Sequence, residues 1–269
     1  MRLGVSYNVF DGEELLESSI WSMQDSVDFV CVVYQTKSNY GEVRSDLEPF
    51  LEDLMARGLI NQLHRYEPHE IDSPLVGEQN EIIKRNIGKD ICVQNGCTHH
   101  ISLDCDEMFD ESEFKRAKEF VIENNLETTY VSYDNFYKKP TLKLKTDGCY
   151  GYISFIVKCD DRYYGRGKSA VVVDPTRRID VRKYHIFNRE FIKMYHYGYI
   201  RKDEESLRRK LNNTSYRQHH LMTKSIDDVV DCYMNHKGVN DIILPWVTGV
   251  RPWELEEVKD KLNILYYER

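Results

Sequence analysis

The sequence of 269 residues predicts an α/β fold: a mainly parallel sheet, then a smaller antiparallel sheet and C-terminal helices. Three observations predict it. In residues 3–66, short apolar runs alternate with amphipathic segments, which is typical of parallel strands joined by helical crossovers. Residues 128–181 are instead rich in Tyr, Thr, Val and Ile, as in antiparallel strands. Helical periodicity returns at residue 204.

The first 66 residues contain three predicted strands separated by helices. Leu3–Asn8 is the first strand, and apolar residues at helical spacing follow Asp11. Phe29–Tyr34 is a continuous apolar run, which is typical of a strand buried on both faces of a parallel sheet. A helix is predicted over Ser45–Arg57 and a third strand over Ile60–Tyr66.

A long helix and a fourth strand come next. Pro74 and Gly96 bracket a helix over about 75–95, because Pro favours the start of a helix and Gly its end. His99–Leu103 predicts the fourth strand, and Glu111–Asn124 predicts another helix.

The remaining residues mix turn signals with helical patterns. Turns are predicted at Asp147-Gly148 and at Asp174-Pro175. Helices are predicted over 204–211 and 226–235, and an apolar run at 242–246 precedes a last segment over 253–262. The chain has no internal repeat and no linker, so we predict one continuous domain.

Composition limits the class of protein. The 37 Lys and Arg against 45 Asp and Glu give a net charge of −8, which argues against a polyanion-binding surface over the whole protein but allows a local basic groove. Seven Cys without a C-x-x-C pair indicate a reduced chain without a structural zinc. The start lacks a signal-peptide pattern and no 18 apolar residues run together, so we expect a cytoplasmic protein with no transmembrane segment.

Two carboxylates stand at the end of the fourth predicted strand. Ile101–Leu103 is apolar, and Asp104 and Asp106 follow where the strand must end. Open α/β sheets bind ligands at this edge, and hard divalent ions prefer oxygen ligands. Two Asp residues at this spacing also occur in solvated turns, but the position at a strand end favours a metal and phosphate site.

This pattern resembles the nucleotide-sugar-dependent glycosyltransferases of the GT-A fold, most closely family 2 and its phage and bacterial relatives. The resemblance covers residues 3–110 well, a later His-containing segment less well and the last 50 residues hardly at all. It implies a nucleotide-binding half over 1–110, an acceptor-side half over 111–200 and a C-terminal helical region over 201–269. The matching segments are Val5–Asn8, Glu78–Asn80, Lys84–Asn86, Ile101–Glu107 and Met194–Lys202.

The resemblance also implies roles around a metal and a diphosphate. Asp106 would bind Mn²⁺ or Mg²⁺, and Asp104 would contact the ribose or the metal, which makes these two the predicted catalytic residues. His196 would complete the metal shell, although a structural role is an equal alternative. Arg201 and Lys202 would contact the diphosphate or form a solvated pair. Glu107 would support the site or face solvent.

Further positions are implied for the nucleotide. Tyr7, Asn8 and Phe10 leave the first strand where the family places its base; Phe10 has the alternative of packing on the next helix, and we expect Asp11 to cap that helix. Asn80 and Lys84 share a helix face and would touch nucleotide or phosphate. A UDP-sugar is the expected donor, but Gln35 stands where many members carry an acidic residue for the base and ribose, which leaves the nucleotide open.

The expected function is transfer of a sugar to an acceptor hydroxyl, preferably of a glycan. A DNA acceptor is the alternative if four lysines form a basic groove rather than protect a strand edge. Nucleotidyl transfer is disfavoured because Asn8–Asp11 is not a Gly-rich loop, and a non-catalytic binding module is the third hypothesis. The lysines are Lys138, Lys139, Lys143 and Lys145, and the unranked candidates for a general base are Asp134, Asp147 and Asp174.

Overall fold

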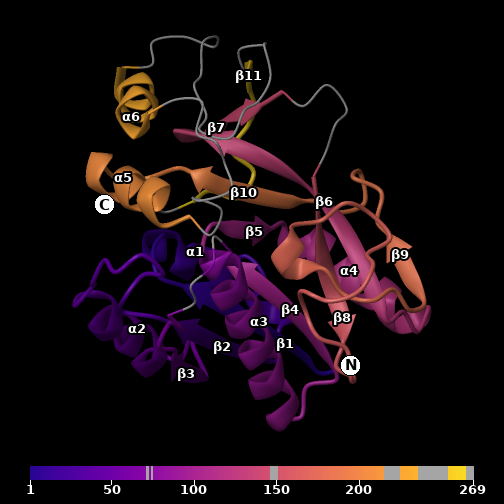
Figure 1. Cartoon of the computed structure of the whole chain (residues 1–269). Helices are drawn as coiled ribbons and strands as arrows, with labels where there is room; N and C mark the ends of the chain where they lie inside the picture. The colour runs from indigo at the N-terminus through magenta and orange to yellow at the C-terminus, as the bar shows by residue number, and fades with distance from the viewer. Residues whose placement is uncertain (71–72, 74, 146–150, 215–224, 236–253, 265–269) are drawn as a thin grey trace.

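The structure is a computed structural model that describes residues 1–70, 73, 75–145, 151–214, 225–235 and 254–264 (Figure 1). The predicted turn at Asp147-Gly148 and the apolar run at 242–246 lie outside the described residues.

Four parallel strands form the first half of the sheet. Their spatial order is β3 (Gln62–Arg65), β2 (Phe29–Tyr34), β1 (Leu3–Val9) and β4 (His99–Asp104). The connecting helices are α1 (Leu16–Trp21), α2 (Leu47–Ala56) and α3 (Val76–Gln94). Helix α1 is shorter than the sequence pattern suggests, because single 3₁₀ turns at Glu13–Leu15 and Gln24–Ser26 flank it.

The sheet continues beyond β4 with antiparallel strands. These are β8 (Tyr152–Lys158), β6 (Thr128–Tyr137), β7 (Lys139–Leu144) and β11 (Leu255–Glu257). A branch adds β10 (Met194–Tyr199), which runs parallel to β6 and antiparallel to β5 (Glu107–Phe109), while β9 (Tyr184–Ile186) runs parallel to β6. Helices α4 (Glu111–Glu123), α5 (Glu204–Asn213) and α6 (Ile226–Asn235) complete the described elements. The predicted α/β architecture is confirmed.

Two predicted segments differ from the structure. Residues 159–183 contain no strand; Asp174 accepts a hydrogen bond from the Thr176 amide and caps the 3₁₀ turn η3 (Pro175–Arg177). The C-terminal region is not all helical, because Leu255–Glu257 pairs with β7. Leu255 is buried there, and the next residue, Glu256, forms an ion pair with Lys143 at 2.6 Å. This alternation of a buried and a polar side chain is that of a strand, not of a helix.

The core holds the carboxyl ends of the parallel strands in place. Val5, Val32, Leu103 and Phe155 are fully buried in one continuous apolar cluster. The strand register sets Asn8 beside both Val33 and Asp104, so the polar residues that end β1, β2 and β4 meet at one edge of the sheet. Within the described residues, no helix is long and apolar enough to cross a membrane.

Candidate active site at the carboxyl edge of the sheet

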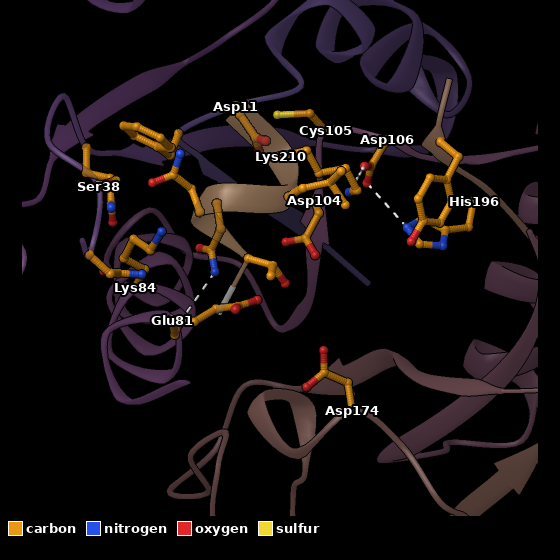
Figure 2. A pocket seen from close by; sticks show the side chains of 18 of the residues that line it. Asp11, Ser38, Glu81, Lys84, Asp104, Cys105, Asp106, Asp174, His196 and Lys210 are labelled. Carbon is orange, nitrogen blue, oxygen red and sulfur yellow. Dashed lines mark hydrogen bonds and ion pairs between the residues drawn. The ribbon is translucent and has the colours of Figure 1, made fainter. Parts of the chain in front are cut away.

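A pocket of about 420 Å³ opens at this edge. Its floor comes from the ends of β1, β2 and β4 and from α3, and its other walls come from β6, β7, β10, α5 and the loop that leads into η3. Figure 2 shows Lys84 and Ser38 at one end, Asp106 and His196 at the other, and Asp104 between them. Seven of the predicted site residues line it: Asn8, Phe10, Gln35, Lys84, Asp104, Asp106 and His196.

Two other predicted nucleotide contacts have side chains that point elsewhere. Tyr7 is fully buried, and its hydroxyl lies 3.0 Å from the Ser19 hydroxyl beneath the sheet edge. The Asn80 amide is also fully buried; it receives a hydrogen bond from the Tyr66 hydroxyl and exchanges two with the backbone of His69. Both side chains stabilise the floor of the pocket and do not line it.

Buried arginines hold Asp104. Its carboxylate accepts hydrogen bonds from Arg85 at 3.1 Å and from Arg177 at 2.7 Å, and Arg177 also forms a two-fold ion pair with buried Glu107. Glu107 in turn accepts the backbone amide of Asp104 at 3.0 Å, so it supports the site and does not face solvent. Burial alone would raise the pKa of Asp104, but Arg85 and Arg177 outweigh it and hold the pKa below its usual value.

Asp106 is buried, with only 5% of its surface exposed. One carboxylate oxygen accepts from Arg201 at 3.0 Å and from Lys210 at 3.2 Å, and the other lies 3.6 Å from Nε2 of His196. Burial would raise the pKa of Asp106, but Lys210, His196 and Arg201 together keep it well below the usual value. Asp106 is therefore charged and aimed into the pocket.

His196 has the orientation of a metal-binding imidazole. It lies on β10 between the buried Tyr195 and Tyr197, so it faces the pocket side of the strand. Its Nδ1 lies 2.6 Å from the amide oxygen of Asn135. This contact fixes the ring so that Nε2 faces Asp106.

The cations that follow β10 are not the expected pair. Arg201 is buried behind Asp106, whereas the side chain of Lys202 is exposed and does not line the pocket. Lys210 takes the place expected for Lys202 because α5 turns the chain back across the pocket. Lys210 was not among the positions that the sequence analysis named. The signal in the sequence was the Leu207–Leu211 apolar spacing, which turns Lys210 away from open solvent.

Lys84 is a buried cation without a partner in the described part of the chain. Only 6% of its surface is exposed, and neither a hydrogen bond nor an ion pair holds its ammonium group among those residues. Burial lowers its pKa, although Glu81 and Asp104 counteract part of this effect. A buried charge of this kind favours an anionic or carbonyl-bearing ligand in the pocket.

Two amide oxygens near Lys84 also lack partners among the described residues. Asn8 and Gln35 each donate their NH₂ group to a backbone carbonyl, of Glu81 at 3.5 Å and of Lys37 at 3.0 Å. Their side-chain oxygens are buried and accept no hydrogen bond from the described residues. The side-chain oxygen of Asn39 is buried and unpartnered in the same way. This end of the pocket thus offers acceptors for the N–H or O–H groups of a ligand.

The structure also distinguishes the candidate bases. Asp174 lines the pocket and, in Figure 2, faces Asp104 and Glu81 from the opposite wall. Asp134 is buried in an ion pair with Arg189, 3.7 Å from Lys143, and Asp147 lies outside the described residues. Asp11 lines the pocket too. It does not cap the following turn, which begins at Gly12 without a side-chain cap, so the capping prediction was wrong.

The donor set fits a divalent ion that is shared with a ligand. No group of three or more His, Cys, Asp or Glu close enough to hold an ion occurs within the described ranges. Asp106 and Nε2 of His196, 3.6 Å apart, are two suitable donors. A site with two protein donors is typical of Mg²⁺ or Mn²⁺ ions that also bind phosphate oxygens.

Comparisons with known proteins found neither a matching family model nor a matching curated protein. Among solved structures, residues 1–349 of S. aureus TarS match at 12% identity over 79% of this chain and 65% of that chain, with a TM-score of 0.45. The TarS 1–349 complex with UDP-GlcNAc matches at 16% identity over 52% and 36%, with a TM-score of 0.35. Mannose-1-phosphate geranyltransferase from Thermus thermophilus matches at 15% identity over 60% and 51%, with a TM-score of 0.31. The chain thus spans less than two thirds of these structures, and with such low scores the chemistry of the site rests on its own residues.

Proposed function

We propose that the protein transfers a glycosyl group from a nucleoside diphosphate sugar to an acceptor hydroxyl. The observation that carries the proposal is the order of groups along one pocket. Unpartnered amide oxygens and Lys84 lie at one end, Asp104 lies in the middle, and Asp106 with His196 lies at the other end. A nucleobase needs hydrogen-bond acceptors, a ribose needs a carboxylate that binds its hydroxyls, and a diphosphate needs a cation site. The pocket offers these groups in that order.

The charge of the pocket supports a divalent ion in this proposal. Five carboxylates and two lysines line it, and Arg85, Arg177 and Arg201 bind Asp104 and Asp106 from behind. These cations are used by the carboxylates, so little positive charge is left for a diphosphate without a further cation. Asp106 and His196 would hold Mn²⁺ or Mg²⁺. The ion would supply Lewis-acid stabilisation of the leaving diphosphate, and Lys210 and Arg201 would add fixed positive charge.

Asp174 is the residue we propose for proton transfer at the acceptor hydroxyl. It faces the pocket from the wall opposite Asp104, where an acceptor would approach. Thr176 donates its amide and its hydroxyl to the same Asp174 oxygen, at 2.8 and 2.9 Å, which fixes the direction of the carboxylate. A general base needs such a defined direction more than a large change in pKa.

A UDP-sugar is the donor we propose to test first. Wild-type protein is mixed with UDP, GDP, ADP and CDP, each with Mn²⁺ or with EDTA, and thermal unfolding is followed. We expect one nucleotide to raise the melting temperature with Mn²⁺, and slow hydrolysis of the corresponding sugar donor. The Asp106→Asn variant should lose both effects. Binding that is the same with EDTA would contradict the metal site, and binding without hydrolysis or transfer would favour a non-catalytic module.

A further inference from the structure

The lysines that sequence analysis offered as a basic acceptor groove do not form one. Lys143 pairs with Glu256 at 2.6 Å, and Lys145 pairs with Glu254 at 2.9 Å. Lys138 donates to the backbone carbonyl of Tyr233 at 2.8 Å. Contacts with β11 and α6 therefore occupy three of these charges; Lys139 and Lys145 are exposed, and Lys145 is the one of these two that is in an ion pair among the described residues.

Positive charge gathers instead in residues 162–183, which we name the basic segment. It joins β8 to β9 and contains seven Lys and Arg but only two Asp, a net charge of +5. Since the whole chain carries −8, the remainder carries −13. Such a strong local asymmetry indicates a binding surface for an anion more than a general solvated face.

The basic segment has a fixed shape. Buried Arg162 anchors it by donating to the Thr128 hydroxyl at 2.6 Å and to the Asp180 carbonyl at 2.7 Å. The Gly165 amide donates to the Arg178 carbonyl at 2.8 Å, so the two arms of the segment lie side by side. Gly165 also lies so close to Ile82 of α3 that a Cβ atom there would approach it to 2.7 Å.

Four of the exposed cations in the basic segment have no ion-pair partner among the described residues. Arg162 and Arg182 are paired with Asp160 and Asp161, and Arg177 is buried against Asp104. The four that remain available are Arg166, Lys168, Arg178 and Lys183.

The basic segment borders the proposed active site. Asp174, which lines the pocket, belongs to the segment, and Arg178 follows directly after the residue that holds Asp104. Arg166 lies beside Arg178 because of the Gly165 hydrogen bond. Arg178 therefore continues the wall from which an acceptor would approach, and Arg166 lies next to it, whereas Lys183 lies at the amino end of β6.

From this arrangement we infer that the basic segment binds an acceptor that carries phosphate groups, such as a phosphate-containing glycan. This inference rests on the proposed function for the identity of the acceptor site. Arginine matches phosphate oxygens with two parallel N–H donors. Four exposed cations are enough to bind a few spaced phosphate groups. A nucleic acid covers a longer surface and would be repelled by the net charge of −13 that the rest of the chain carries.

The test compares two triple variants. One replaces Arg166, Lys168 and Arg178 by Gln; the control replaces the exposed Lys115, Lys139 and Lys259 by Gln, which removes the same charge elsewhere. Binding of labelled linear polyphosphate, of a dT oligonucleotide of equal charge and of neutral dextran is measured between 50 and 200 mM salt. Circular dichroism and thermal unfolding verify that each variant folds, and nucleotide binding verifies the donor site separately.

We expect the wild type to bind polyphosphate and not dextran, with a steep salt dependence. The basic-segment variant should lose roughly tenfold in affinity at 50 mM salt and about two units of salt slope, and the control less than twofold. Equal losses in both variants, or no polyphosphate binding by the wild type, would overturn the inference. An oligonucleotide that binds more than tenfold tighter than polyphosphate would overturn it in favour of a nucleic acid. Because the nucleotide measurement is separate, a failure here leaves the proposed donor site standing.

Discussion

The floor and the far wall of the pocket are built in different ways. The floor comes from the ends of β1, β2 and β4 and from α3, where consecutive strands of a parallel sheet bring Asn8, Gln35 and Asp104 to one edge. The far wall comes from β10 and α5, which lie much later in the chain. Strand β10 pairs through its backbone with β5 and β6, and α5 contacts Asp106 through Lys210. Backbone pairing therefore places the floor and β10, whereas side-chain contacts place α5.

The largest effect is expected where floor and wall meet. Asp106→Asn removes the charge that Arg201, Lys210 and His196 share, so we expect glycosyl transfer to fall by roughly 100-fold or more and the protein to melt earlier. Steady-state rates with Mn²⁺ and thermal unfolding measure both effects. The exposed Glu119→Gln serves as the control. Unchanged turnover in the Asp106 variant would remove this residue from the site.

On the wall alone, His196→Ala should weaken metal-dependent donor affinity by about 10–100-fold. Asn135→Ala should act in the same direction with a smaller effect, because Asn135 only fixes the imidazole that faces Asp106. Donor titrations at several Mn²⁺ concentrations separate the two variants. A His196 variant that melts early but binds donor normally would show that the residue is structural.

On the floor alone, Lys84→Met should have opposite effects on binding and stability. Removing the buried, unpartnered ammonium should raise the free energy of unfolding by about 1 kcal/mol, because a desolvated charge is lost. Donor affinity should fall by about tenfold, because a charged contact is lost. Urea unfolding measures the expected rise in the free energy of unfolding, and nucleotide titration measures the expected fall in donor affinity. If both quantities fell, Lys84 would be a structural residue of the floor.

The smallest effect concerns pH beneath the floor. His100 is buried between the Ser6 and Tyr164 hydroxyls, and burial, with Lys89 and Arg85, lowers its pKa to about 3. The unfolded chain therefore binds the proton more readily below about pH 6.5, so stability is present above that pH and is lost as pH falls. Between pH 7 and pH 6 this amounts to about 0.5–1 kcal/mol, measured by urea unfolding. In the His100→Gln variant the pH dependence should be smaller by this amount, because His99, whose pKa burial lowers to about 4, keeps its own contribution. An unchanged slope would assign the effect to other groups.

The sequence predicted the floor better than the wall. Phe29–Tyr34 and Ile101–Leu103 are continuous apolar runs, so the parallel type of the strands and the edge that carries the site followed from the pattern alone. The wall depends on where α5 crosses the pocket, which no local pattern encodes; this is why Lys202 was favoured and Lys210 was not. Tyr7 and Asn80 show a related limit, because the sequence placed their backbones near the site but did not say that their side chains turn into the protein.

The turn η3 has a consequence for how the enzyme we propose would work through a cycle. Asp174 opens this turn and Arg177 closes it, and Arg177 is tied to both Asp104 and Glu107. The short turn η3 therefore fixes the distance between Asp104 on the donor side and Asp174 on the acceptor side. Helix α5 contacts the loop after β2 through exposed ion pairs and hydrogen bonds of Glu42, so we expect an opening that releases the spent nucleotide to involve α5. We expect turnover to slow as solvent viscosity rises, because α5 must move. The turn η3 should keep its position during that movement.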